Sequence, residues 1–119
     1  MKLLSENEIN VYQSPDPQHI YAYSPGITRL PSGRLIATMD ISGPGACDLY
    51  GVKWLQPEPD WSCQGQIYTS DDGGETWTLR GFFPFMHARP FSAGNKLYIL
   101  GHANDLMIIQ SQDDGETWS

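Results

Sequence analysis

The stretches "SDDGGETW" (70–77) and "SQDDGETW" (111–118) decide the fold. Both fit the pattern S-x-D-x-G-x-T-W, which recurs after roughly 40 residues. In each copy the Asp can accept hydrogen bonds from the backbone N–H groups of a turn, and the Gly supplies a positive φ. The Ser and Thr add local hydrogen bonds, and the Trp buries an indole against neighbouring structure. Each octapeptide therefore predicts a polar hairpin turn, built from Ser70, Asp72, Gly74, Thr76, Trp77, Ser111, Asp113, Gly115, Thr117 and Trp118.

The same octapeptides gather carboxylates, so a calcium loop is the alternative interpretation. The ligand spacing of an EF-hand is absent, however, and the flanking residues favour strands over helices. Cys47 and Cys63 form no C-x-x-C pair, and no His lies at zinc-ligand spacing from either of them. We therefore expect neither a metal nor a cofactor, and two free thiols in preference to a disulfide.

Apolar, β-rich runs alternate with turn signals along the whole chain, and no window shows sustained helical periodicity. One hairpin is expected around Gly33 and a second around the first octapeptide. The succession of strand, Gly turn, apolar strand, loop, strand, polar turn and Trp then recurs. The expected strands cover residues 8–13, 26–30, 34–41, 65–70, 76–83, 88–94, 95–103 and 105–111.

A period of roughly 40 to 50 residues with four strands is typical of a β-propeller blade. The sequence thus predicts an all-β fold, namely a partial propeller of about two blades, each a four-stranded antiparallel meander. We expect one domain over residues 1–119. Blade one covers about 21–83 and carries a long insertion over 42–64, blade two covers about 84–119 and is truncated, and 8–13 is a spare amino-terminal strand.

The repeated pattern resembles the Asp-box, or bacterial neuraminidase repeat, of the sialidase superfamily, and the resemblance covers residues from about 21 to the end. "YSPGITRLPSGRLIAT" (23–38) is similar to the opening blade motif of catalytic sialidases. "RPFSAGNKLYILGH" (89–102) looks closer to uncharacterised sialidase-like repeat proteins. The resemblance implies that the Asp-box is a structural element on the face opposite the catalytic centre of the family, so it predicts fold rather than activity.

In a meandering blade, the start of strand one and the connection between strands two and three lie at the rim opposite the octapeptides. Carboxylates, an Arg, imidazoles and Trp faces at this rim suit a sugar or a carboxylated ligand. Structural roles are the alternatives: ordinary loop histidines, an ion pair of Arg89 with Asp40 or Asp105, and indoles of Trp54 and Trp61 that pin the insertion. The candidates are Tyr23, Ser24, Asp40, Asp48, Trp54, Trp61, His87, Arg89, His102, Asn104 and Asp105.

Catalysis has two weak candidates, Asp40 and Arg89. The resemblance places the acid/base Asp of sialidases near Asp40, whereas Ser24 stands at or near the place of their first carboxylate-binding Arg. The Tyr nucleophile and its Glu partner come from later blades in that family, and glycoside hydrolysis needs a nucleophile or base as well as an acid. We therefore expect a non-catalytic module. The alternative is a sialidase-type glycoside hydrolase whose site is shared between chains.

Charge and hydropathy exclude some partners. Fourteen acidic residues outnumber seven scattered basic ones, for a net charge of −7, which disfavours binding to nucleic acid. No apolar run approaches the roughly 18 residues of a membrane span, so no membrane partner is expected. The first ten residues lack the apolar core of a secretory signal, which favours the cytoplasm. An extracellular or periplasmic location would require that a signal had been removed.

A propeller needs at least four blades to close, and the sialidase class uses six. Two blades alone would leave apolar faces and strand edges uncovered. Copies of the chain are therefore expected to assemble, with a trimer favoured and a dimer as the alternative, unless the chain is an inactive fragment of a longer propeller protein. Residues 8–13 would fill the missing strand of a neighbouring copy. The function expected is a self-assembling module that binds a carbohydrate or a small polar ligand.

Overall fold

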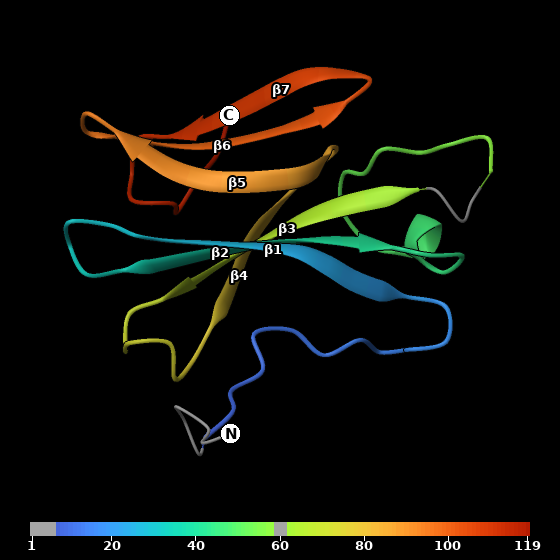
Figure 1. The fold of residues 1–119 in the computed structure, drawn as a ribbon, viewed down its shortest axis with the longest axis horizontal. Coiled ribbons are helices and arrows are strands. Elements are labelled where there is room, and N and C mark those ends of the chain that lie inside the picture. The colour runs from blue at the N-terminus through green and yellow to red at the C-terminus, as the bar shows by residue number, and fades with distance from the viewer. Residues whose placement is uncertain (1–6, 59–61) are drawn as a thin grey trace, which may run out of the picture.

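The computed structural model describes residues 7–58 and 62–119. These residues fold as two antiparallel sheets, with one short 3-10 helix, η1 (Ala46–Asp48), in the long insertion. Neighbouring strands pair in chain order, so each sheet is a meander (Figure 1). The larger sheet consists of β1 (Tyr21–Arg29), β2 (Leu35–Ser42), β3 (Cys63–Ser70) and β4 (Thr78–Phe83), and the smaller one of β5 (Met86–Ala93), β6 (Lys96–Ala103) and β7 (Asp105–Ser111).

The all-β class predicted from the sequence is confirmed, and the larger sheet has the four strands expected of its meander. The smaller sheet has three strands in the described part of the chain. Beyond β7, the backbone of Ser119 exchanges two hydrogen bonds with Gln110, at 2.9 and 3.0 Å. In the larger sheet the equivalent pair is Thr78 with Thr69, where β4 begins.

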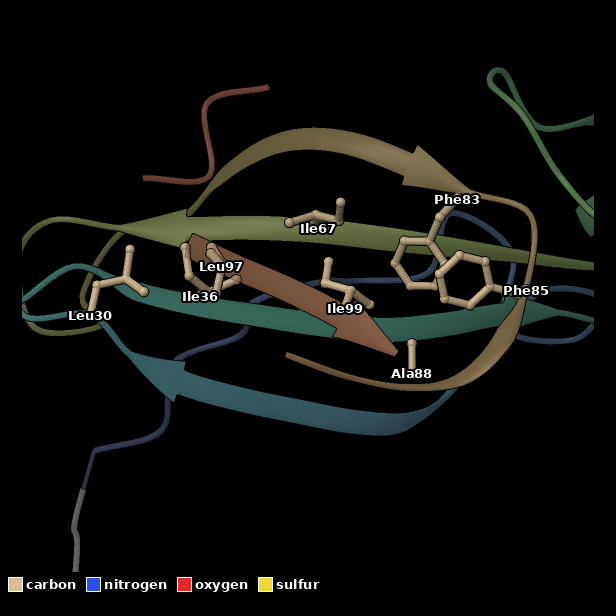
Figure 2. Packing of buried hydrophobic residues seen from close by; sticks show 8 residues of the cluster. All are labelled: Leu30, Ile36, Ile67, Phe83, Phe85, Ala88, Leu97 and Ile99. Atoms are coloured by element: carbon tan, nitrogen blue, oxygen red, sulfur yellow. The ribbon is translucent and has the colours of Figure 1, made fainter. Parts of the chain in front are cut away.

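The two sheets pack face to face over one apolar core. Figure 2 shows Leu97 and Ile99 of β6 lying over Ile36 of β2 and Ile67 of β3. All four side chains are buried, and burying a side chain of this size contributes about 1.5–3 kcal/mol. The same cluster is completed by Leu30, Phe83, Phe85 and Ala88. Because the chain crosses from β4 to β5 beside Phe83 and Phe85, the crossover itself is anchored in this core.

A second apolar cluster lies on the opposite face of the larger sheet. We call this face the outer face and define it by Ala37, Met39, Ile41 and Tyr68, all of which are buried. Residues 7–20, the cover segment, lie across it on the side away from β5–β7 (Figure 1). Its side chains that pack there are those of Val11, Tyr12 and Ile20.

The strand expected over residues 8–13 is therefore wrong: these residues form no strand. Two prolines, Pro15 and Pro17, follow at once, and proline cannot donate to a β-ladder. The apolar side chains of the segment instead cover the outer face, which would otherwise meet water. The segment therefore buries the apolar outer face instead of pairing with the edge of a strand.

The strand registers show which positions of the two sheets are equivalent. Leu35 pairs with Ser70, and Leu97 pairs with Ser111, where the two serines open the two octapeptides. Continuing along the strands makes Ile67 equivalent to Ile108. Ile67 is fully buried under the smaller sheet, whereas Ile108 is 55% exposed.

The face of β5–β7 that carries Ile108 is uncovered. We call it the open face. Along β5 and β6 its other large side chains alternate with buried ones, and the rings of Phe91 and Tyr98 stack on it with centroids 5.5 Å apart. The open face consists of Phe91, Tyr98, Leu100, Leu106 and Ile108.

None of the described segments forms a helix long and apolar enough to cross a membrane.

Candidate functional site

The two octapeptides form turns with the same hydrogen bonds. In the first, the Gly74 N–H donates to Ser70 Oγ at 2.9 Å and the Thr76 N–H donates to Asp72 Oδ1 at 2.9 Å. The Trp77 indole N–H donates to the Gly74 carbonyl at 2.9 Å, and Gly74 has the left-handed φ of +96° that this turn needs. The second copy repeats each bond with Ser111, Asp113, Gly115, Thr117 and Trp118.

The two turn aspartates are fully exposed carboxylates held by local donors. The hydroxyl and backbone N–H of Thr76 lower the pKa of Asp72 to about 2, and those of Thr117 do the same for Asp113. Hydrogen bonds to the charged form, rather than a neighbouring cation, cause both shifts. The carboxylate oxygens are thus hydrogen-bonded inside the turns. This arrangement suits a residue that stabilises the turn better than one that binds a ligand.

Ion pairs join the two turns to each other. Arg34 donates to Asp71 at 2.7 Å and to Glu116 at 2.6 Å, and Arg80 donates to the other oxygen of Glu116 at 2.7 Å. A hollow of about 600 Å³ lies between the turns. Of its charged groups, Arg34, Asp71 and Glu116 already pair with one another, and Asp113 is bonded within its own turn. The hollow is lined by Arg29, Ser32, Gly33, Arg34, Asp71, Gly73, Asp113, Asp114 and Glu116.

The opposite rim is shaped by two β-bulges at equivalent positions. The register of β1 shifts between Tyr23 and Gly26, and that of β5 shifts between Met86 and Arg89. Each bulge holds a non-glycine residue at positive φ, Ser24 at +51° in β1 and His87 at +54° in β5. Left-handed conformations are uncommon for such residues and cluster at functional sites, and bulges often re-aim side chains there.

The carboxyl of Asp40 lies beneath this rim and is fully buried. Its Oδ2 accepts a hydrogen bond from the His87 backbone N–H at 2.7 Å, and its Oδ1 has no hydrogen-bond partner in the described part of the chain. Burial raises the pKa of Asp40, although the His87 N–H and the Ser24 side chain act in the opposite direction. Asp40 therefore holds the bulge of β5 in place, and burial favours its protonated form.

Two imidazoles and a guanidinium stand at the surface above Asp40. His87 Nδ1 and His102 Nε2 lie 2.8 Å apart, so one ring donates a hydrogen bond to the other. One Nη of Arg89 donates to the carbonyl oxygens of Ser24 at 3.1 Å and Ala88 at 2.9 Å. Its other guanidinium N–H groups form no bond to a described residue, and all three side chains are exposed. We call Ser24, Asp40, His87, Arg89 and His102 the rim cluster.

The structure therefore brings together five residues that the sequence places at this rim, from β1, β2, β5 and β6. Arg89 bonds backbone carbonyls instead of forming the ion pair considered for it. Tyr23 lies beside the cluster, because it is paired with Asp40 across β1 and β2 and is 37% exposed.

The other candidates lie apart from the rim cluster. Asp48 is exposed in η1 and Asp105 is exposed at the start of β7, next to Asn104 at a φ of +67°. Trp54 is half-buried and exchanges two backbone hydrogen bonds with Cys63, which tie the insertion to β3. In the described ranges, the side chains of these candidates make no hydrogen bond or ion pair to the cluster. Trp61 lies outside the described residues.

Sequence reasoning missed two residues near these sites. Arg34, which joins the turns, gave no signal beyond being one of seven scattered cations. Cys63 is fully buried near Asp40, and burial raises the pKa of its thiol to about 12. Only its pairing with Cys47 was considered from the sequence, and both thiols are free, as predicted.

Metal ligands do not gather in the described part of the chain, where no group of three or more His, Cys, Asp or Glu residues could hold an ion. The chain matches no family model, no curated protein and no solved structure.

Proposed function

We propose that this protein is a non-catalytic, sialidase-like propeller module that assembles with itself and binds a carbohydrate or a small polar ligand at the rim cluster. The repeated octapeptide and the meander order of the strands support the propeller part of this proposal. The open face, which is the equivalent of a covered face in the same chain, supports self-assembly. The rim cluster supports ligand binding.

The observation that carries the proposal is the contrast between the two ends of the sheets. At the octapeptide end the polar groups bond one another within turns. At the opposite rim, Arg89 has surface N–H donors that bond no described residue, and His87 and His102 on the same rim have exposed imidazoles. A guanidinium binds a carboxylate through paired hydrogen bonds, and imidazoles donate to or accept from hydroxyl groups.

Asp40 contributes to this site as a positioning residue. It is buried, so it does not meet a ligand at the surface directly. Its hydrogen bond from the His87 backbone holds the left-handed conformation that aims the His87 ring at His102. The polar surface of the site is thus pre-organised by a group below it, which lowers the conformational entropy lost when a ligand binds.

The test is ligand binding by calorimetry or by saturation-transfer NMR, with sialic acid, glucuronic acid and N-acetylglucosamine as probes. We expect Arg89→Ala to weaken binding of a carboxylated probe at least tenfold, because a charge-assisted pair is lost. The matched control is Arg29→Ala, an exposed Arg at the octapeptide end, which should bind like the unsubstituted chain. No binding of any probe, or equal loss in both variants, would contradict ligand binding at the rim.

A hydrolase of the sialidase type is the second candidate, favoured by one observation. The Asp40 carboxyl has a raised pKa, as a general acid requires, although it lies buried below the rim surface. Turnover of a fluorogenic sialoside that is abolished by Asp40→Asn, with the fold intact by circular dichroism, would replace the non-catalytic proposal. Absence of turnover across a panel of glycosides would exclude the hydrolase.

A further inference from the structure

The open face repeats a surface that this chain already covers. Strand register makes Tyr98 the equivalent of Ile36, Leu100 of Thr38 and Ile108 of Ile67. Ile36, Thr38 and Ile67 are all fully buried, because the smaller sheet packs on them. The same positions in the smaller sheet are left partly or largely exposed. The packing of the smaller sheet on the larger one therefore indicates what kind of surface would fit the open face.

The surface that fits is the one that β5–β7 themselves present to the larger sheet. Leu97 and Ile99 supply its apolar side chains, and their equivalents in the larger sheet are Leu35 and Ala37. Ala37 belongs to the outer face. A second copy of the chain thus carries a surface of the required kind, but on the side of its larger sheet that its own cover segment occupies.

The cover segment is attached by side-chain packing rather than by a β-ladder. Val11 and Tyr12 pack on the outer face and are half-buried. Within the described residues, 8–18 make no backbone hydrogen bond to either sheet, and the segment first bonds the insertion where Gly45 N–H donates to the His19 carbonyl at 2.9 Å. Segments with few such bonds open at low free-energy cost.

We propose that the open face of one copy binds the outer face of a second copy, head to tail, after the cover segment of the second copy has moved away. This rests on the proposed function, because it specifies how the module assembles with itself. The cover segment then regulates association. If the outer face is free in about one molecule in a hundred, the apparent Kd is about a hundredfold weaker than that of the uncovered surfaces.

The same geometry would complete the ligand site between two copies. Inside the chain, the β5 bulge with His87 lies on Asp40, the equivalent of His102. Applied to a pair of copies, this relation sets the β1 bulge of the second copy, with Ser24 and Tyr23, beside His102 of the first. Arg89 would then lie at the junction rather than at an open rim.

The experiment uses three full-length chains and analytical ultracentrifugation. The loosened chain carries Val11→Asp and Tyr12→Ser, which weaken the cover segment. The blocked chain carries these two changes and Ile108→Asp, so that only its outer face can associate. The third is the unsubstituted chain, whose open face alone is accessible. Near-UV circular dichroism establishes that each chain is folded.

Head-to-tail association predicts that the blocked and unsubstituted chains form a one-to-one complex when mixed. The Kd for self-association of either chain alone should be at least tenfold weaker than the Kd of this complex. The loosened chain, which has both surfaces, should grow into larger species as its concentration rises. If the unsubstituted and loosened chains both form dimers, while the blocked chain stays monomeric and does not join the unsubstituted chain, two open faces pair with each other. This outcome would overturn this inference and leave self-assembly standing. Monomers in every sample would contradict both.

A second measurement serves if the loosened chain does not fold. In the unsubstituted chain labelled with fluorotyrosine, the ¹⁹F signal of Tyr12, assigned with Tyr12→Phe, reports whether the ring is packed on the outer face. The inference requires this signal to move to its solvent-exposed position in proportion to the associated fraction. Association with an unchanged Tyr12 signal overturns it.

Discussion

The octapeptide end and the opposite rim use the same repeat in different ways. At the octapeptide end Asp72 and Asp113 occupy equivalent positions, accept the same hydrogen bonds and have the same lowered pKa of about 2. At the rim Asp40 is equivalent to His102, and Ser24 to His87. Both bulges persist there, but the side chains on them differ. A shared backbone with divergent side chains is what a binding site on a repeated scaffold requires.

Equivalent faces of the two sheets also differ, because one is buried and the other is the open face. Isoleucines at equivalent positions, Ile67 and Ile108, are 0% and 55% exposed. The repeat has therefore preserved the apolar character of a face that only one of its copies buries in this chain. The predictions below test three equivalent pairs, beginning with the pair for which the two copies should differ most.

The largest difference in unfolding free energy is expected between substitutions at Ile67, in the core, and at Ile108, on the open face. Ile67→Ala should lower the free energy of unfolding by about 2–5 kcal/mol, because it leaves a cavity in the core. Ile108→Ala should cost less than about 1 kcal/mol in a dilute monomer, because its side chain already meets solvent. Urea unfolding at low concentration measures both. A large cost at Ile108 would show that the open face is covered in solution.

An intermediate effect is expected at the rim. Asp40→Ala should cost about 1–3 kcal/mol, because the partly buried hydrogen bond from the His87 N–H loses its acceptor. Its counterpart, His102→Ala, removes an exposed ring and should cost below about 1 kcal/mol.

The pH dependence of Asp40 has a definite sign. Because the folded-state pKa is raised, the native state binds more protons than the unfolded state, and stability is lost as pH rises above about 4. Asp40→Asn should remove this loss, so that the advantage of the variant in urea titrations grows as pH rises above about 4. An advantage that is constant with pH would mean that Asp40 is ionised throughout.

The smallest difference is expected at the turns, where the two copies should respond alike. The folded-state pKa of Asp72 and Asp113 is about 2 against a usual 3.8, so their stabilising contribution is complete above about pH 4 and is lost as pH falls towards 2. Asp72→Asn and Asp113→Asn should each reduce this loss of stability at acid pH by the same amount. Thermal melts between pH 2 and 5 at constant salt measure it. Unequal responses would end the equivalence of the turns.

Local chemistry explains what the sequence could predict. The octapeptides place Gly and Asx residues where hairpins need them, and the apolar runs between them are strands in the structure. Residues 8–13 were mispredicted because alternating apolar residues suit both a strand edge and a cover across a face. The bulges had no signal either, because neither Ser24 nor His87 is a Gly, and a single His, although enriched at positive φ, does not mark a bulge. Burial of Asp40 depends on β5, far along the chain.

The ion pairs of Arg34 bear on the mechanics of the molecule. The polypeptide links the sheets at the rim, through Phe83 and Phe85 in the core, whereas Arg34 and Glu116 link them at the octapeptide end. The sheets are thus joined covalently at the rim and by ion pairs at the octapeptide end, an electrostatic clasp. The paired groups are partly exposed, so salt weakens their attraction. Any opening of the two sheets should begin at the clasp and pivot about the rim. The proposed binding surface would then lie at the end of the sheets that moves least in such an opening.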